Sequence, residues 1–191
     1  EMGLRSGGAS EHERFFGLGD VSVPWSTEEL WHAAQDAFRC SLSQGPVRMA
    51  AARRSADRLA HQLGLLDDWF EELAAATCKG CPAPCCNHAK VWLDFQDLLF
   101  IHLHQEALPP HQLRRNLHEP CRFLGGYGCT LPRLSRPWIC TWYICPTQRQ
   151  ALERDVPGGM VQLTAMMSRV KFLREEMERR FLKALGLTPA V

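Results

Sequence analysis

The residues of this chain that can do chemistry are its cysteines, because eight of the nine fall between Cys78 and Cys145. The first four lie in the run CKGCPAPCC, which has the spacing C-x2-C-x3-C-C. A C-x2-C turn lets two sulfurs converge on one metal ion or cluster while backbone amides point toward them. Thiolates at this density are typical of sites for soft or borderline metals. The candidate ligands are Cys78, Cys81, Cys85, Cys86, Cys121, Cys129, Cys140 and Cys145.

The adjacent pair Cys85 and Cys86 limits how these ligands combine. Neighbouring side chains tend to diverge, so the pair is unsuited to holding one mononuclear ion in relaxed geometry. We expect two neighbouring sites, or one ligand beside a packed thiol. The eight cysteines then form two four-thiolate sites, or one such site with the remaining thiols packed.

Two kinds of metal centre suit these thiolates. Zinc takes a closed tetrahedral ligand set and would be a structural staple, whereas an iron-sulfur cluster takes four thiolates and adds redox chemistry. The crowded spacing and the Cys81-Pro82 and Cys145-Pro146 steps favour an iron-sulfur cluster as the cofactor, with zinc as the alternative.

A framework of disulfides is the main structural alternative for an even set of cysteines. A chain of 191 residues can bury about 70% of the surface of its unfolded state, so it does not need such staples. The sequence begins without a charged segment followed by an apolar run, and its apolar stretches are too short for a membrane span. We therefore expect a cytoplasmic protein with reduced thiols.

The balance of charge argues against binding to nucleic acid or to anionic lipid. Lysine and arginine number 22 against 21 acidic residues, which gives a net charge of +1. A protein with this balance has no general attraction to polyanions. The pairs Arg53-Arg54 and Arg114-Arg115 lie in helical patterns and are expected on solvated helix faces.

Several other side chains near the cysteines could support a metal. His88 lies two residues after Cys86 and is expected at the surface or behind the ligands. Arg122 and Arg136 could donate hydrogen bonds or balance thiolate charge. The aromatic residues expected to shield the metal from water are Trp92, Trp138, Trp142 and Tyr143.

The sequence shows no catalytic constellation and no G-x-S-x-G, P-loop or H-E-x-x-H motif. Asp94 is a natural helix cap and Asp97 a helix-face residue, so acid-base catalysis is not predicted. His102 and His104 alternate and point to different helix faces, which makes them poor shared ligands. Cys40 stands alone on a predicted amphipathic helix and is expected to be a core thiol.

The elements before the cysteines are predicted to be an arm and three helices. Residues 1–26 are rich in glycine, serine and charge and indicate an irregular N-terminal arm. A first helix begins at Ser26-Thr27 and closes at Gly45-Pro46. A second runs from about 47 to 62, with Gly64 as its terminator, and a third begins at Asp67 or Asp68 and leads into the cysteine run.

The second half of the chain is predicted to be more broken. Residues 90–93 indicate a short extended segment, followed by a helix from Asp94 toward Leu108. Residues 119–146 hold glycines, prolines and cysteines and predict irregular or short-hairpin backbone, too broken for a helix. A long amphipathic helix from about 160 to 185 follows. The fold class is therefore mainly α: a small helical bundle that carries a cysteine-rich irregular region.

These segments predict one helical domain, residues 27–191, with a cysteine core at 78–146. The combination of C-x2-C-x3-C-C, CRFLGGYGC, Arg136-Pro137, Cys140 and Cys145 resembles the YkgJ-type cysteine-cluster family, whose members are described as zinc- or iron-chelating domains. The resemblance implies metal binding through the eight cysteines in a bacterial cytoplasmic protein. A similar module in flagellin lysine N-methylases is associated with an iron-sulfur cluster and suggests a supporting role in protein modification.

The function predicted from the sequence is metal binding, with iron-sulfur favoured, in electron transfer, metal handling or as an accessory factor. A protein or redox partner is expected, and neither nucleic acid nor membrane. Two alternatives stay open: an iron-sulfur-supported enzyme that modifies a protein or small substrate, and a zinc-stapled helical adaptor whose last helix binds a partner.

Overall fold

The computed structural model describes residues 22–43, 45–78, 81–126 and 128–187. Helices make up nearly all the regular structure of these residues, and the only strands among them form one two-stranded antiparallel hairpin. The mainly α fold and the short hairpin predicted from the sequence are thereby confirmed. The elements are α2 (Glu28–Leu42), α3 (Pro46–Thr77), α4 (Cys85–His88), α5 (Phe95–His104), β1 (Leu124–Gly125), β2 (Gly128–Cys129), η1 (Arg133–Ser135), α6 (Trp138–Trp142), α7 (Pro146–Asp155) and α8 (Gly159–Ala184).

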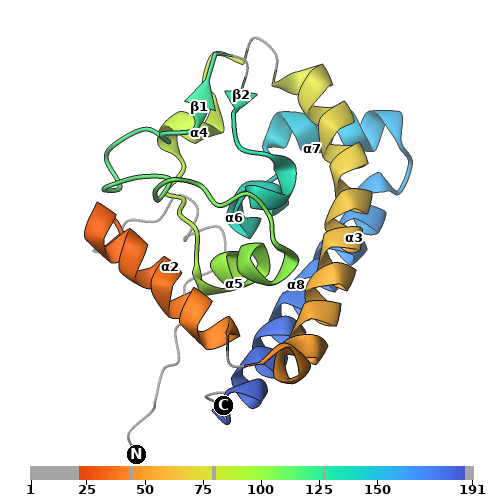
Figure 1. The fold of residues 1–191 in the computed structure, drawn as a ribbon. Coiled ribbons are helices and arrows are strands. Elements are labelled where there is room, and N and C mark those ends of the chain that lie inside the picture. Colours follow the sequence, from red (N-terminus) through yellow and green to blue (C-terminus); the bar gives the residue numbers. More distant parts are fainter. Residues whose placement is uncertain (1–21, 44, 79–80, 127, 188–191) are drawn as a thin grey trace, which may run out of the picture.

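The helices α3 and α8 form the framework of the molecule. They lie side by side and run in opposite directions, with α3 in orange to yellow and α8 in blue in Figure 1. The apolar residues of α8 recur at helical spacing, as predicted, and pack against α3. Their buried contacts join Leu163, Val170, Met177 and Phe181 to Met49, Leu59 and Leu66 of α3 in one core cluster.

The prediction of two helices between residues 47 and 77 is wrong, because α3 is one continuous helix of 32 residues. Gly64 was expected to end the first of them, but it lies inside the helix and is not among the glycines with positive φ. A glycine inside a helix costs about 1 kcal/mol relative to alanine. Packing of Leu59 and Leu66, on either side of Gly64, offsets this cost, since both are buried in the core.

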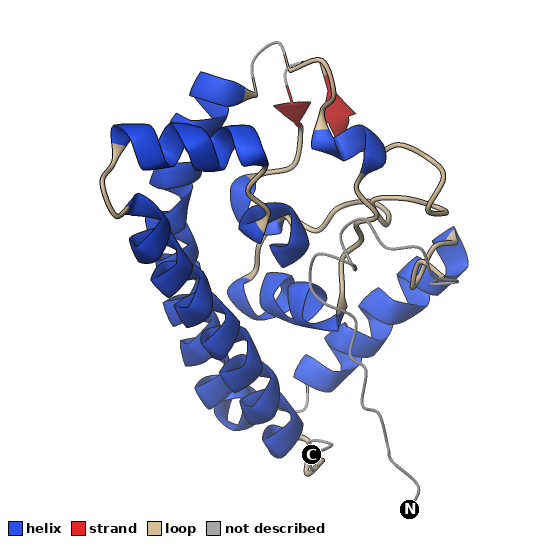
Figure 2. Cartoon of the chain, turned by 180° about the vertical axis from the view of Figure 1, so that it is seen from behind, coloured by secondary structure: helices blue, strands red, loops and turns tan. Residues whose placement is uncertain are grey.

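Helix α5 lies between α2 on one side and the α3–α8 pair on the other (Figures 1 and 2). Asp94 caps it, as predicted: its carboxylate accepts a hydrogen bond from the Asp97 amide at 2.8 Å, and the Asp97 carboxylate accepts one from the Asp94 amide at 3.0 Å. The helix ends at His104, earlier than the predicted Leu108, because Gln105 adopts a left-handed conformation at φ 60°. Its buried residues line most of its circumference, as expected for a central helix.

Helix α2 begins at the predicted place and buries a narrow stripe. Thr27 caps it by accepting a hydrogen bond from the Leu30 amide. The buried residues are Trp31, Gln35 and Phe38. Cys40, two residues further on, is exposed, so the prediction of a core thiol is wrong. Two residues are roughly 200° around a helix, which turns Cys40 away from the buried face.

Part of the predicted N-terminal arm is described, and residues 1–21 lie outside the described chain. Val23 is buried, and the Pro24 carbonyl accepts a hydrogen bond from the Gln112 amide group at 3.1 Å. The end of the arm thus docks on the domain. No helix among the described residues is both long enough and apolar enough to cross a membrane.

The histidine His102 of α5 predicts a pH-dependent stability. Burial, with a smaller effect of Arg39, lowers the pKa of His102 to about 4 from its usual 6.5. The folded protein disfavours protonation of the His102 ring. The contribution of the neutral ring to the unfolding free energy is therefore fully present above about pH 6.5 and is lost as the pH falls toward 4. We expect a loss of about 2 kcal/mol of unfolding free energy in the native protein, which is absent in His102→Gln.

Urea unfolding at about pH 7 and about pH 4.5 measures this difference. The matched control is His61→Gln, because His61 is exposed on α3, and it should retain the native pH dependence. An equal pH dependence of His102→Gln and the native protein would show that His102 is not held neutral.

Candidate metal centre

The cysteine-rich segment is more regular than predicted. Besides the hairpin, residues 119–146 contain the 3-10 turn η1 and the five-residue helix α6, so the expectation that this segment is too broken for a helix is wrong. Helix α7 follows and was not predicted, and the cysteine pair at 85–86 begins the short helix α4. Elements as short as α4, η1 and α6 show no apolar periodicity from which they could be predicted. They gather above α5 in Figure 1, at the end of the molecule opposite the C-terminus.

Four cysteines form a first group around the ends of α3 and α7. Cys78 ends α3, and the Cys81 amide donates to the Cys78 carbonyl at 3.1 Å. Cys145 caps α7, where its thiol accepts a hydrogen bond from the Gln148 amide at 3.4 Å. The side-chain amide of Gln148 accepts a hydrogen bond from the Cys145 amide at 3.2 Å and donates one to the Cys78 sulfur at 3.6 Å. One buried glutamine therefore bridges cysteines that are far apart in the sequence.

Cys85 is the fourth member of this first cysteine group. Burial raises the pKa of the Cys85 thiol, and the nearby thiols of Cys145, Cys78 and Cys81 raise it further. Tyr143 lies near this group. Burial raises the pKa of its hydroxyl, and the thiols of Cys85 and Cys145 raise it further. The group thus combines the end of α3, the loop after it and the start of α7.

The other four cysteines form a second group around the hairpin. The Cys121 amide donates to the Cys86 carbonyl at 3.3 Å, and the Leu124 amide donates to the Cys121 carbonyl at 3.1 Å. Cys129 is paired with Leu124 across the hairpin. Cys140 joins them from α6. The members of the second cysteine group are Cys86, Cys121, Cys129 and Cys140.

Burial and mutual repulsion raise the thiol pKa values in the second cysteine group. Burial raises the pKa of Cys86 to about 11, and Cys121 and Cys129 add to the shift. Burial also raises the pKa of Cys121, with Cys129 contributing. Cys140 retains exposed surface, yet desolvation by the protein around its thiol and the proximity of Cys86, Cys121 and Cys129 raise its pKa as well. These four thiols therefore lie near one another.

The short helix α4 explains how neighbouring cysteines serve different groups. Cys85 and Cys86 are its first two residues. Consecutive residues of an α-helix point roughly 100° apart. The Ala89 amide donates to the Cys85 carbonyl at 2.7 Å and closes this turn. The predicted divergence of the two side chains follows from this helical turn.

The described residues contain no group of three or more histidine, cysteine, aspartate or glutamate side chains that is arranged to hold an ion as it stands. All nine cysteines are free thiols. The donor set nevertheless fits the expected cofactors by its chemistry, because tetrahedral zinc and a four-iron cluster each take four thiolates. The residues that would hold such a group are the four members of either cysteine group.

A buried arginine that the sequence analysis assigned to a solvated face lies beside the second cysteine group. Arg114 is only 1% exposed, so that expectation is wrong. Its guanidinium donates to the Cys86 carbonyl at 2.7 Å and to the Glu119 carbonyl. Burial lowers the pKa of Arg114, and the thiols of Cys121, Cys140 and Cys86 oppose the shift. No carboxylate among the described residues forms an ion pair with it.

Sequence reasoning missed Arg114 because the adjacent Arg115 is exposed and a pair of arginines is usually solvated. The two arginines that it did single out lie elsewhere. Arg122 is exposed, and Arg136 donates to the Leu131 carbonyl at 3.1 Å. His88 is exposed at the end of α4, as predicted for a surface residue. Arg114 is therefore the arginine that lies beside the second cysteine group.

The aromatic residues that were expected to shield the metal are partly buried. Trp138, Trp142 and Tyr143 are partly buried and pack against the core, and the rings of Trp142 and Tyr143 meet edge to face at 6.3 Å. Trp92 is half-buried. Tyr143 lies near Cys85 and Cys145, because their thiols add to the rise that burial causes in its pKa.

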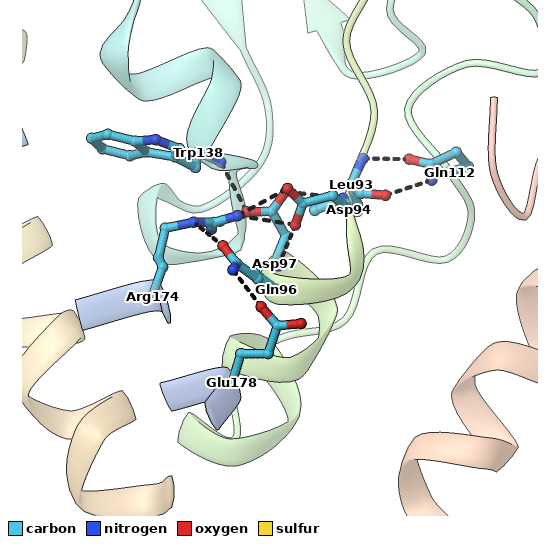
Figure 3. Close-up of polar contacts among 8 residues, drawn as sticks. All are labelled: Leu93, Asp94, Gln96, Asp97, Gln112, Trp138, Arg174 and Glu178. Carbon is cyan, nitrogen blue, oxygen red and sulfur yellow. Dashed lines mark hydrogen bonds and ion pairs between the residues drawn. The ribbon is translucent and has the colours of Figure 1, made fainter. Parts of the chain in front are cut away.

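A buried ion pair fixes the helix that carries Cys140. Asp97 of α5 and Arg174 of α8 are both nearly inaccessible and lie 2.5 Å apart (Figure 3). The same Asp97 oxygen accepts a hydrogen bond from the Trp138 amide, the first of α6, at 3.0 Å. Burial raises the pKa of Asp97, and the guanidinium of Arg174 opposes that shift. Asp97 is thus a structural anion and not the helix-face residue expected from the sequence.

A second polar anchor positions the segment that leads to Arg114. The Gln112 side chain is buried, accepts hydrogen bonds from the Leu93 and Leu113 amides at 2.8 and 2.9 Å, and donates to the Leu93 carbonyl at 3.1 Å. Figure 3 shows its pairing with Leu93 beside the Asp97 network. The chain just before Arg114 is therefore held by the start of α5.

Comparison with protein-family models, with curated proteins and with solved structures finds no match. The resemblance to the YkgJ-type family stays a prediction that rests on the cysteine pattern.

The Asp97–Arg174 pair predicts a large loss of stability when one partner is removed. Arg174→Met leaves the buried Asp97 carboxylate without its cation, so we expect the unfolding free energy to fall by about 3 kcal/mol. Urea denaturation followed by circular dichroism measures this change. The matched control is Arg154→Met, because Arg154 pairs with Asp155 on the exposed surface, and little change is expected there. Equal stability of the two variants would contradict the structural role of the buried pair.

The buried Arg114 predicts an effect on metal retention. Loss of its positive charge in Arg114→Met should make the second cysteine group release metal to a colorimetric chelator about tenfold faster than in the native protein, as for other residues that support metal ligands. The neighbour Arg115→Met is the control and should release metal at the native rate. Identical release by both variants would mean that Arg114 does not compensate thiolate charge.

Proposed function

We propose that this chain is a cysteine-ligated iron-sulfur protein that serves a larger enzyme or a redox partner as an accessory electron carrier. The observation that supports this proposal is the convergence of four distant cysteine-bearing segments. The elements that carry them lie above α5 in Figure 1: the end of α3, α4, the β1–β2 strands, α6 and the start of α7. Their thiols neighbour one another. Hydrogen bonds from Gln148 and from Arg114 hold this arrangement.

Packing alone gives little reason for eight thiols to gather in this way. Buried cysteines behave as small apolar residues and need no other cysteines around them. Here, however, the thiols neighbour one another, and Cys78 and Cys140 are exposed. A metal or cluster removes their mutual repulsion, because it binds thiolates and neutralises part of their charge. Metal ligation therefore accounts for the arrangement better than burial does.

The structure also supports a binding role over a catalytic one. Among the described residues, the acidic pair Asp94 and Asp97 was the only candidate for acid-base work, and both pair with Arg174. A bound iron-sulfur cluster would supply one-electron redox chemistry. The chain's own residues would then hold the cluster, balance its charge through Arg114 and restrict water through Tyr143. The electron would come from a reduced partner protein and pass to an oxidised one.

The test is the metal and acid-labile sulfide content of the protein purified without oxygen, together with its visible spectrum. We expect iron and sulfide in equal amounts and a brown colour, because thiolate-bound clusters absorb visible light. Zinc without sulfide would contradict the redox role and favour the zinc-stapled adaptor. Absence of both metals, with all eight clustered thiols free to react, would refute metal binding altogether.

A further inference from the structure

We propose that the eight clustered cysteines form two separate four-thiolate centres that are joined at the peptide bond between Cys85 and Cys86. This inference rests on the proposed metal binding and specifies its ligands. The ligands of the first centre are the first cysteine group, Cys78, Cys81, Cys85 and Cys145. The ligands of the second centre are the second cysteine group, Cys86, Cys121, Cys129 and Cys140.

The hydrogen bonds divide the cysteines in this way. Gln148 contacts the sulfurs of Cys78 and Cys145, which places those two cysteines together. The backbone of Cys86 meets that of Cys121, and the hairpin register adds Cys129 to the same side. The thiol neighbours agree with this division apart from the adjacent pair itself: Cys85 lies near Cys145, Cys78 and Cys81, and Cys140 lies near Cys86, Cys121 and Cys129, whereas Cys86 also neighbours Cys85.

The order of the ligands along the chain crosses between the centres twice. Cys85 and Cys86 are adjacent but belong to different centres, and so do Cys140 and Cys145. Helix α6 ends at Trp142, between the latter two, and α7 begins just after Cys145. In two-cluster ferredoxins, likewise, the last cysteine of a closely spaced run ligates the other cluster. Such crossing is a known way to place two clusters side by side.

The two centres have different electrostatic surroundings. Four thiolates leave either centre with net negative charge after a zinc ion or a cluster is bound. The second centre has the buried cation Arg114 next to it. The first centre has the Gln148 amide and the N-terminus of the ten-residue helix α7, which also stabilise negative charge but carry no full charge. Two unlike environments of this kind are expected for two centres and not for one pooled site.

The Nε atom of Arg114 supplies an independent observation. It is buried without a hydrogen-bond partner among the described residues. A buried guanidinium nitrogen without an acceptor is destabilising. The thiols of Cys86, Cys121 and Cys140 lie near this guanidinium and would be anionic as metal-bound thiolates. The second centre, when it carries thiolates, provides the missing negative charge.

The experiment compares Cys81→Ser with Cys129→Ser in the full chain, because each variant removes one half-buried thiol from one centre. Both proteins are reconstituted with ferrous iron and sulfide without oxygen, and iron and sulfide are counted. We expect about eight iron atoms per chain in the native protein and about half of that in either variant. Circular dichroism verifies that the helices are retained.

Alkylation with iodoacetamide, mapped by mass spectrometry, identifies which thiols each variant exposes. In Cys81→Ser we expect labelling of Cys78, Cys85 and Cys145, while the second cysteine group stays protected. In Cys129→Ser the pattern is reversed. Cys40 is exposed and outside both groups, so it is labelled in every sample, and Cys40→Ser should keep the native iron content.

The outcomes separate the two proposals. If one substitution removes all the iron, or leaves all of it bound, while the fold is retained, the eight cysteines do not form two centres, although metal binding stands. If the native chain binds neither iron nor zinc, the proposed function fails as well. Two zinc ions per chain, with one lost in either variant, would support two centres and reject iron-sulfur.

A titration of the unaltered protein covers the case in which a serine variant does not fold. Zinc is added to the native apo-protein, and the bound ions are counted by native mass spectrometry. Saturation at two zinc ions per chain supports two four-thiolate centres, since zinc takes four ligands in a closed site. Saturation at one ion would overturn the proposal.

Discussion

The ion pair between Asp97 and Arg174 lies where α5, α6 and α8 meet, and both side chains are nearly inaccessible. Taking two charges out of water is costly, and their attraction repays this cost only when further hydrogen bonds satisfy the remaining atoms. The Trp138 and Asp94 amides and the Gln96 side chain supply these bonds. The packing of α5 against α8 and the position of the start of α6 therefore both depend on this ion pair. Its hydrogen bonds orient these helices, which a non-directional apolar contact could not do.

The rest of the molecule divides into two parts that are stabilised differently. The α3–α8 pair and α5 are held by an apolar core whose members are almost fully buried. The cysteine end contains only short elements, joined by single hydrogen bonds such as that between Cys121 and Cys86. Short elements with few apolar contacts open more easily than core helices. The proposed metal would therefore stabilise the part of the fold that has least stability of its own.

The sequence predicted the features that depend on local chemistry. The helical spacing of buried residues along α8, the helix start at Thr27, the Asp94 cap and a short hairpin within residues 119–146 all follow from residues close together in the chain. Prediction from the sequence failed where contacts between residues far apart in the chain determine the structure. The helix continues through Gly64 because Leu59 and Leu66 on either side of it pack in the core. Arg114 is buried because the backbone carbonyls of Cys86 and Glu119 accept hydrogen bonds from its guanidinium. The Gln148 contact joins residues 70 positions apart, and no local pattern could reveal it.

Cys145 occupies the N-cap of α7, a place usually taken by an oxygen-bearing side chain, and accepts a hydrogen bond there through sulfur. A neutral thiol is a weak acceptor, whereas a thiolate places a full negative charge at the positive end of the helix macrodipole. The charge state of the Cys145 sulfur thus determines the stability of the first turn of α7. Ionisation of Cys145 would therefore slow amide hydrogen exchange at Gln148. The exchange rate of this amide would report the charge state of the Cys145 thiol.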